Sequence, residues 1–200
     1  FPRLSCVLSR ALAEEDALLE FDNVFTEALS LDQPLARSLA ANGLTECSDR
    51  RILTRLLALL SKDESESVRS SVAVALSHFA VMGRDGKLQV RDVERLRASL
   101  DTALGRPGES LNVRRRALEA IGAFPDEAAV GHIRSAYESG EELLVQSALF
   151  AMGLSSDGRW LPEVLRELKS RNAAVRYEAA RALGGIGEES QAECLEEAIE

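Results

Sequence analysis

The sequence predicts an all-α fold, a solenoid of antiparallel helix pairs, and three observations support this prediction. Apolar residues at i, i+4, i+7, i+8 and i+11 mark one face of a helix along Ala173–Gly187, and the pattern recurs 31 residues earlier and again 31 residues before that. Apolar residues make up 46% of the chain but aromatic residues only 4%, so the core must consist mainly of Ala, Leu, Val and Ile. Few stretches alternate apolar and polar residues, so we expect almost no strand.

Each repeat is predicted to begin with a helix that one apolar anchor residue places in register. The five anchors are Ala36, Val68, Val113, Leu144 and Val175. The residues three positions before them are the predicted N-caps, namely Gln33, Ser65, Ser110, Glu141 and Asn172. Ser and Asn are strong N-caps because their side-chain oxygens accept hydrogen bonds from the first-turn amides. The predicted helix starts therefore agree with the apolar register.

Second helices follow the first ones in the same register. Their apolar residues in the last four repeats are Val93, Leu96 and Leu100; Val130, Ile133 and Tyr137; Leu161, Val164 and Leu168; and Ala192, Leu195 and Ile199. Among the first helices, Ala120, Ala151 and Ala182 share one position of the repeat. We expect these alanines where neighbouring helices touch, because small residues allow close approach.

The repeats divide the chain unevenly. Residues 1–31 are predicted to form an irregular N-terminal helical pair, and residues 32–200 about five repeats. One repeat of 45 residues is longer than the others, and we expect loop insertions at 83–92 and 103–109, since both segments contain turn-forming Gly, Pro or Asp. The last predicted helix ends on an apolar face without a polar capping helix. We therefore expect the natural chain to continue past Glu200, or this end to pack on another copy.

The segments VRSSVAVAL, VRRRALEAIG and VRYEAARALGGIG resemble HEAT repeats of the short, Ala-rich bacterial type, also called phycobilisome-lyase-like repeats. The resemblance covers residues 32–200. It implies a right-handed α-solenoid, or superhelix, whose Val-Arg helices line the concave face. The arginine of the family corresponds here to Arg37, Arg69, Arg114 and Arg176, and Val145 interrupts the series. The aspartate that the family often has five residues before the valine is matched by Asp63 alone, so a continuous Asp–Arg ladder is not predicted.

Charge and cysteine usage exclude several classes of protein. The net charge is −9, whereas a general nucleic-acid-binding surface needs clustered Lys and Arg. No apolar run reaches 18 residues, so no transmembrane helix is predicted. The three cysteines, Cys6, Cys47 and Cys194, are far apart and odd in number. A disulfide framework is therefore not predicted, and we expect a cytoplasmic protein.

The sequence contains no recognisable catalytic or metal-binding motif. It has no phosphate loop, no G-x-S-x-G and no H-E-x-x-H. His78 and His132 have no Cys, Asp or Glu at ligand spacing in their own helices, and Cys47 occupies an apolar core position. We therefore predict no catalytic residue, no metal and no cofactor, and a protein that is not an enzyme.

The remaining candidates lie two, three and six positions after each anchor, which we expect to face solvent. In the last three repeats these positions carry the residue types enriched at interaction hot spots, namely Arg115, Arg116, Phe150, Tyr177 and Arg181. We predict a scaffold that binds a partner protein or peptide, preferably an acidic one, on the concave face.

The sequence leaves two alternative functions open. The family resemblance implies, first, a chromophore-lyase-like or chaperone-like helper, which would need a Cys or His in the groove. It implies, second, a nucleic-acid-binding protein, for which Arg114, Arg115, Arg116 and Arg181 are the only basic cluster.

Overall fold

The computed structural model describes residues 21–186, and within that range the regular elements are all helices. They are α2 (Phe21–Ala28), α3 (Pro34–Gly43), α4 (Leu53–Lys62), α5 (Glu66–Arg84), α6 (Val90–Gly105), α7 (Leu111–Ile121), α8 (Glu127–Glu138), α9 (Glu142–Ser155), α10 (Leu161–Glu167) and α11 (Ala173–Ile186). Short 3₁₀ turns at Arg50–Ile52 and Gly158–Trp160 precede α4 and α10. Three predictions concern residues outside this range. They are those for Cys6, for Cys194 and for the helix with Ala192, Leu195 and Ile199.

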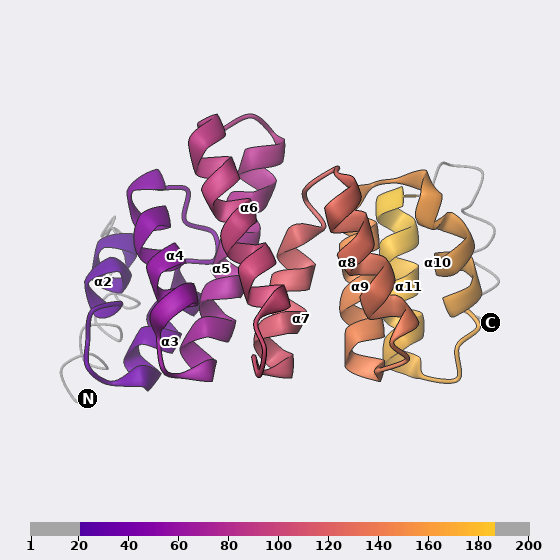
Figure 1. Cartoon of the computed structure of the whole chain (residues 1–200), viewed down its shortest axis with the longest axis horizontal. Coiled ribbons are helices and arrows are strands. Elements are labelled where there is room, and N and C mark those ends of the chain that lie inside the picture. The colour runs from indigo at the N-terminus through magenta and orange to yellow at the C-terminus, as the bar shows by residue number, and fades with distance from the viewer. Residues whose placement is uncertain (1–20, 187–200) are drawn as a thin grey trace, which may run out of the picture.

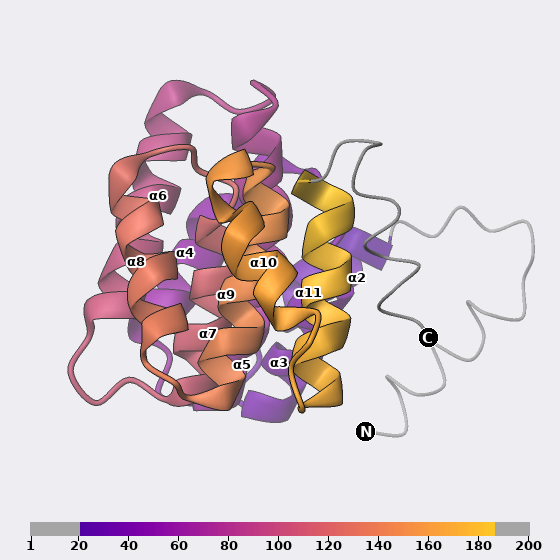
Figure 2. The same cartoon turned by 90° about the vertical axis from the view of Figure 1, so that its right-hand side faces the viewer.

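The helices follow one another along the long axis of the molecule, from α2 at one end to α11 at the other (Figure 1). The first helices of the repeats, α3, α5, α7, α9 and α11, pack each on the next, and each second helix packs on the first helix of the following repeat. Successive first helices approach one another more closely than successive second helices do, as the inner row of a curved stack must. The view along the stack shows the two sets of helices together (Figure 2). This arrangement is an α-solenoid, as predicted.

All five predicted N-cap positions are confirmed, since α3, α5, α7, α9 and α11 each begin one residue after them. The side chain completes the cap in two cases. Ser110 Oγ accepts a hydrogen bond from the Val113 amide at 3.3 Å, and Asn172 Oδ1 accepts one from the Ala174 amide at 2.8 Å. The local signal and the apolar register therefore fix the same helix starts.

The extra residues of the long repeat are found in helices as well as in loops, which corrects the predicted insertions at 83–92 and 103–109. Helix α5 has 19 residues and α6 has 16, whereas α7 has 11. Gly83 remains helical because it packs closely beside Val93 of α6, and the connecting loop buries Leu88. The insertion thus lengthens a helical hairpin whose turn is made at Gly86, which has a φ of 71°.

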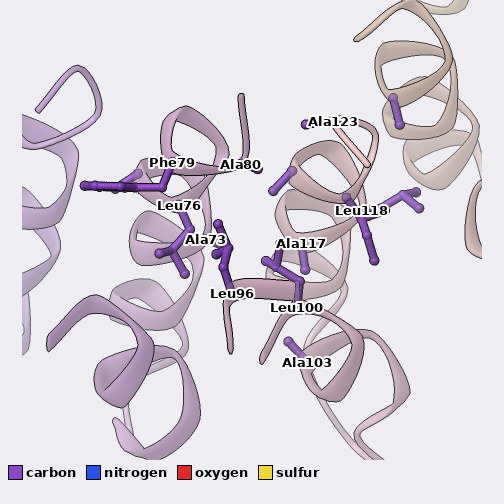
Figure 3. Close-up of a cluster of buried hydrophobic side chains, with 14 of the residues drawn as sticks. Ala73, Leu76, Phe79, Ala80, Leu96, Leu100, Ala103, Ala117, Leu118 and Ala123 are labelled. Atoms are coloured by element: carbon purple, nitrogen blue, oxygen red, sulfur yellow. The ribbon is translucent and has the colours of Figure 1, made fainter. Parts of the chain in front are cut away.

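A continuous apolar core runs between the two sets of helices. Leu96 and Leu100 of α6 are fully buried and lie between α5 and α7 (Figure 3). Ala120, Ala151 and Ala182 are also buried, as predicted. Successive first helices can therefore approach to backbone contact at these positions.

Candidate interaction surface

The five predicted binding residues lie on three neighbouring first helices. Arg115 and Arg116 belong to α7, Phe150 to α9, and Tyr177 and Arg181 to α11. Because α9 packs on both α7 and α11, the stack brings these residues onto one face. We call it the α7–α9–α11 face and define it by these five residues together with Glu119, Ser147 and Glu178.

Aromatic and cationic groups meet at the α11 side of this face. The guanidinium carbon of Arg181 lies 4.3 Å from the ring centroid of Phe150, which is the geometry of a cation–π contact. Tyr177 is 67% exposed. A pocket of about 200 Å³ adjoins the pair and is lined by Phe150, Gly153, Leu154, Arg181, Ala182 and Gly185.

Three positions that we expected to face solvent are buried between repeats instead, and the first of them is Ser71 of α5, which is 7% exposed. Ser147 is 1% exposed and Glu119 is 8% exposed. Ser147 Oγ donates a hydrogen bond to Glu119 at 2.7 Å, and Arg115 Nε donates to Ser147 Oγ at 3.1 Å. Ser71 and Ser147 are third positions after their anchors and bond to the preceding first helix. Glu119 is a sixth position and bonds to Ser147 of the following first helix. The helices approach too closely to leave these positions open, so the prediction of exposure was wrong for these three residues.

Carboxylates balance part of the positive charge on the face. Arg116 Nη1 donates to Glu119 at 2.7 Å. Glu178 Oε2 is buried and accepts no hydrogen bond within the described chain, and Arg181 Nη1 is 3.7 Å away. Burial raises the pKa of Glu178 above 4.5; Arg181 opposes this rise and Glu119 adds to it. Burial therefore disfavours the charged form of Glu178, which lies on α11 between Tyr177 and Arg181.

The other candidate residues occupy packing or pairing positions. His78 bonds to Ser48 at 3.1 Å, and His132 lies 3.2 Å from Asp101. Burial raises the pKa of the Cys47 thiol to about 11, with a further contribution from Asp22. In residues 21–186 no three His, Cys, Asp or Glu side chains group in a way that could hold a metal ion. Over the same residues no helix is long and apolar enough to cross a membrane.

Ion pairs link the early repeats in a way that the sequence predicted only in part. Arg37 donates to both oxygens of Asp63, at 2.7 and 3.0 Å. Arg69 pairs with Glu109 at 2.6 Å, although the sequence predicted no partner there. Glu109 stands four residues before its anchor, whereas the family pattern has an aspartate five residues before it, so that pattern did not predict the pair. A pattern that accepts Asp or Glu at either four or five residues before the anchor would have predicted it.

These arginines also hold the loop before their own helix. Arg37 Nη1 donates to the Leu31 and Asp32 carbonyls. Arg69 and Arg176 repeat the contact with the carbonyls six and five residues earlier, at distances from 2.7 to 3.2 Å. The family arginine thus has two functions, one in its own loop and one toward the next repeat.

The fold and this surface define a helical-repeat protein of the α-solenoid class. The HEAT repeats family model matches residues 135–200, and the PBS lyase HEAT-like repeat model matches residues 113–139. These two matches support a HEAT-repeat protein of the PBS-lyase-like type.

Comparison with individual proteins finds a curated relative and, among the solved structures, designed armadillo repeat proteins of similar fold. Deoxyhypusine hydroxylase from Bos taurus is 32% identical over 94 residues, which cover 46% of this chain and 31% of the relative. The chain thus spans about a third of that relative's length. A designed armadillo repeat protein in complex with the peptide (KR)4 has a TM-score of 0.54 at 18% identity, covering 90% of this chain and 87% of the other. A second designed armadillo repeat protein has a TM-score of 0.50 at 18% identity, covering 87% and 86%.

Proposed function

We propose that this protein is a non-catalytic scaffold that binds a partner protein or peptide on the α7–α9–α11 face. The observation that carries the proposal is the Phe150–Arg181 pair beside the exposed Tyr177. Aromatic rings offer a large apolar contact area and lose few rotamers on binding. Three adjacent first helices hold these groups, so a partner would meet a rigid surface rather than mobile loops.

An acidic segment with an apolar anchor is the partner chemistry that fits this face. Arg115 uses its Nε atom for Ser147 and the Leu143 carbonyl, and its terminal nitrogens have no partner within residues 21–186. Arginine can bind a carboxylate through two parallel hydrogen bonds. An Asp or Glu of the partner would pair with Arg115, while its apolar residue would contact Phe150 and Tyr177.

The non-catalytic part of the proposal rests on the chemistry of the described side chains. Cys47 is buried with a raised pKa, which disfavours the reactive thiolate. His78 and His132 contact Ser48 and Asp101, and both lie outside the α7–α9–α11 face. The buried free thiol of Cys47 also supports a cytoplasmic location, which we include in the proposal.

Selection from a displayed library of random peptides on the immobilised protein tests the proposal. We expect enrichment of peptides in which Asp or Glu neighbours Leu, Phe or Trp. Charge reversal at Arg115 (Arg115→Glu) should remove that preference, whereas the same change at Arg91, which is exposed on α6, should not. Failure to enrich any peptide, or enrichment of Lys- and Arg-rich ones, would contradict the proposed partner chemistry.

A further inference from the structure

Two junctions between consecutive first helices contain the same arginine–carboxylate pair. The arginine stands one residue after an anchor, and the carboxylate precedes the next anchor. Arg37 pairs in this way with Asp63, and Arg69 with Glu109. The side chains of these two arginines are only 16% and 15% exposed, and both carboxylates are almost fully buried. The repeats therefore build one kind of site twice, at the junctions α3–α5 and α5–α7.

The next junction keeps the arginine but lacks the carboxylate. Arg114 follows the anchor of α7, whereas the positions five and four residues before the anchor of α9 are Ser139 and Gly140. Ser139 Oγ accepts a hydrogen bond from the amide two residues later at 3.2 Å, as Asp63 Oδ1 does at 2.9 Å. Ser139 thus has the structural position of Asp63, with a short neutral side chain in place of the carboxylate.

The missing carboxylate leaves Arg114 open. Its side chain is exposed and forms no hydrogen bond or ion pair with any other residue between 21 and 186. The five N–H donors of a guanidinium group are therefore available to a ligand. Helix α7 packs between α5 and α9 in the middle of the stack, so described repeats flank this junction on both sides (Figure 1).

Arg114 lines a pocket of about 310 Å³ between α6, α7, α8 and α9. Ser139 also lines the pocket, and so does Ser135, whose hydroxyl has no hydrogen-bond partner within the described chain. Leu118 and Leu144 belong to its apolar wall. A cationic group, a free hydroxyl and an apolar wall together suit an anion that is attached to a short carbon chain.

The neighbouring charges do not neutralise Arg114. His132 lines the same pocket, and its Nε2 atom lies 3.2 Å from Asp101. Arg97 also binds Asp101, at 2.7 Å, so the charge of this aspartate is already compensated. The pocket adjoins the C-terminal ends of α6 and α8, whose carbonyl groups disfavour an anion. The two filled sites have the same place after α4 and α6, and a guanidinium group outweighs the carbonyls in both.

We propose that this pocket binds a carboxylate on a short carbon chain, in the place that the chain's own carboxylates take at the two earlier junctions. The carboxylate accepts hydrogen bonds from Arg114 and Ser135. Its carbon chain lies against Leu118 and Leu144. A glutamate side chain of a bound polypeptide and a free dicarboxylic acid share this chemistry. The pocket includes none of the residues that define the α7–α9–α11 face, so the inference does not depend on the proposed function.

Titration of the isotope-labelled protein, followed by NMR, tests this inference with two probes, glutarate and the blocked peptide acetyl-Ala-Glu-Ala-amide. We expect a saturable shift of the Arg114 Nε–Hε resonance. The peptide acetyl-Ala-Gln-Ala-amide, which lacks the carboxylate, and sodium chloride at equal ionic strength should not produce it. A shift with the Glu peptide would identify a polypeptide side chain as the ligand, and a shift with glutarate alone a free small acid. No saturable shift with either probe would overturn the inference.

Two substitutions remove the site in opposite ways. Arg114→Gln removes the cationic group and should weaken binding of the probe at least about tenfold, since a hydrogen bond to a charged group contributes this much. Ser139→Asp supplies the missing carboxylate from the chain itself. It should reduce binding to a similar extent and raise the Tm, because Arg114 gains the partner that Arg37 has in Asp63.

Matched controls separate these effects from a general change in charge. Ser139→Asn has the size of the aspartate variant without its charge and should bind the probe as the parent does. Arg91→Gln removes an exposed positive charge of α6 that does not line the pocket, and it should also bind normally. Circular dichroism melting checks that every variant is folded. Unchanged probe affinity in Arg114→Gln or in Ser139→Asp would overturn the inference.

Discussion

Gly153 of α9 lies so close to Ala182 of α11 that a methyl group on the glycine would stand 2.6 Å from the Ala182 Cα atom. One repeat earlier, Gly122 and Ala151 have the same relationship. The partners are backbone atoms, which cannot move aside as the end of a flexible side chain can. Small residues at these positions therefore set the distance between repeats.

Gly153→Ala should destabilise the protein by about 1–3 kcal/mol, because the added methyl group overpacks a contact between two helix backbones. Gly184→Ala is the matched control. It lies at the equivalent position one repeat later, where the added Cβ atom meets no atom of residues 21–186 within 4 Å. That variant should gain about 0.5–1 kcal/mol, since Ala is the better helix former. Urea unfolding followed by circular dichroism measures both, and equal effects of the same sign would refute the packing account.

Ala151→Leu tests the other side of the same contact. Ala151 is fully buried and faces Gly122, so the larger side chain has no space. We expect a loss of about 1–3 kcal/mol and a lower Tm. A variant that melts like the parent would show that this register is wrong.

The Arg69–Glu109 pair should make the early repeats sensitive to acid. Burial alone would raise the pKa of Glu109, but hydrogen bonds from Arg69 and from the Ser110 amide outweigh it and hold the pKa below 4.5. The stabilisation is therefore complete above pH 4.5 and is lost as the pH falls from there through the lower pKa of the folded state. Arg69→Met should destabilise the protein at neutral pH, because it leaves the buried Glu109 carboxylate with only Arg106 and the Ser110 amide, at 2.9 and 3.0 Å, as partners.

Unfolding in urea at several pH values measures this effect. The destabilisation by Arg69→Met should shrink as the pH falls below 4.5. In the double variant Arg69→Met, Glu109→Leu, which removes both charges, the loss should be smaller than in the single variant. A double variant less stable than Arg69→Met would contradict the role assigned to the pair.

The sequence predicted the stack well because its signals are local and repeated. The anchors, the N-caps and the small residues each recur in every complete repeat, so one misread residue does not change the register. The hairpin of α5 and α6 was predicted less well. Turn-forming residues suggested loops, but Gly83 lies in a helix because α6 packs against it. A tertiary contact that occurs once leaves no periodic signal.

Glu178 should show the opposite dependence on pH from Glu109. Its pKa is raised, chiefly by burial, so the folded protein favours the protonated acid and the charged form is a cost above pH 4.5. Glu178→Gln should therefore stabilise the protein at neutral pH. The difference from the parent should disappear as the pH falls through the raised pKa toward 4.5. Thermal melts across this pH range measure it, and a destabilised Glu178→Gln variant at neutral pH would contradict the assignment.

The candidate surface could be predicted only in part, because periodicity shows which residues share a helix face but not how closely neighbouring helices pack. Helix periodicity placed Arg115, Phe150 and Arg181 on one face, and the structure brings them onto adjacent helices. Periodicity could not show how closely those helices approach. The burial of Ser147 and Glu119 and the cation–π contact of Arg181 depend on that distance, which is set by Gly122 and Gly153 in other parts of the helices.

The affinity of a library-selected acidic peptide for the variant Phe150→Ala, Tyr177→Ala tests the central claim most directly. Fluorescence anisotropy would give the Kd for this variant, for the parent, and for the control Ser38→Ala, Ser70→Ala on α3 and α5. If the α7–α9–α11 face binds the partner, the aromatic double variant should lose about 2 kcal/mol or more, and the serine control should bind like the parent. Parental affinity in the aromatic double variant would contradict the account and would assign binding to another surface of the solenoid.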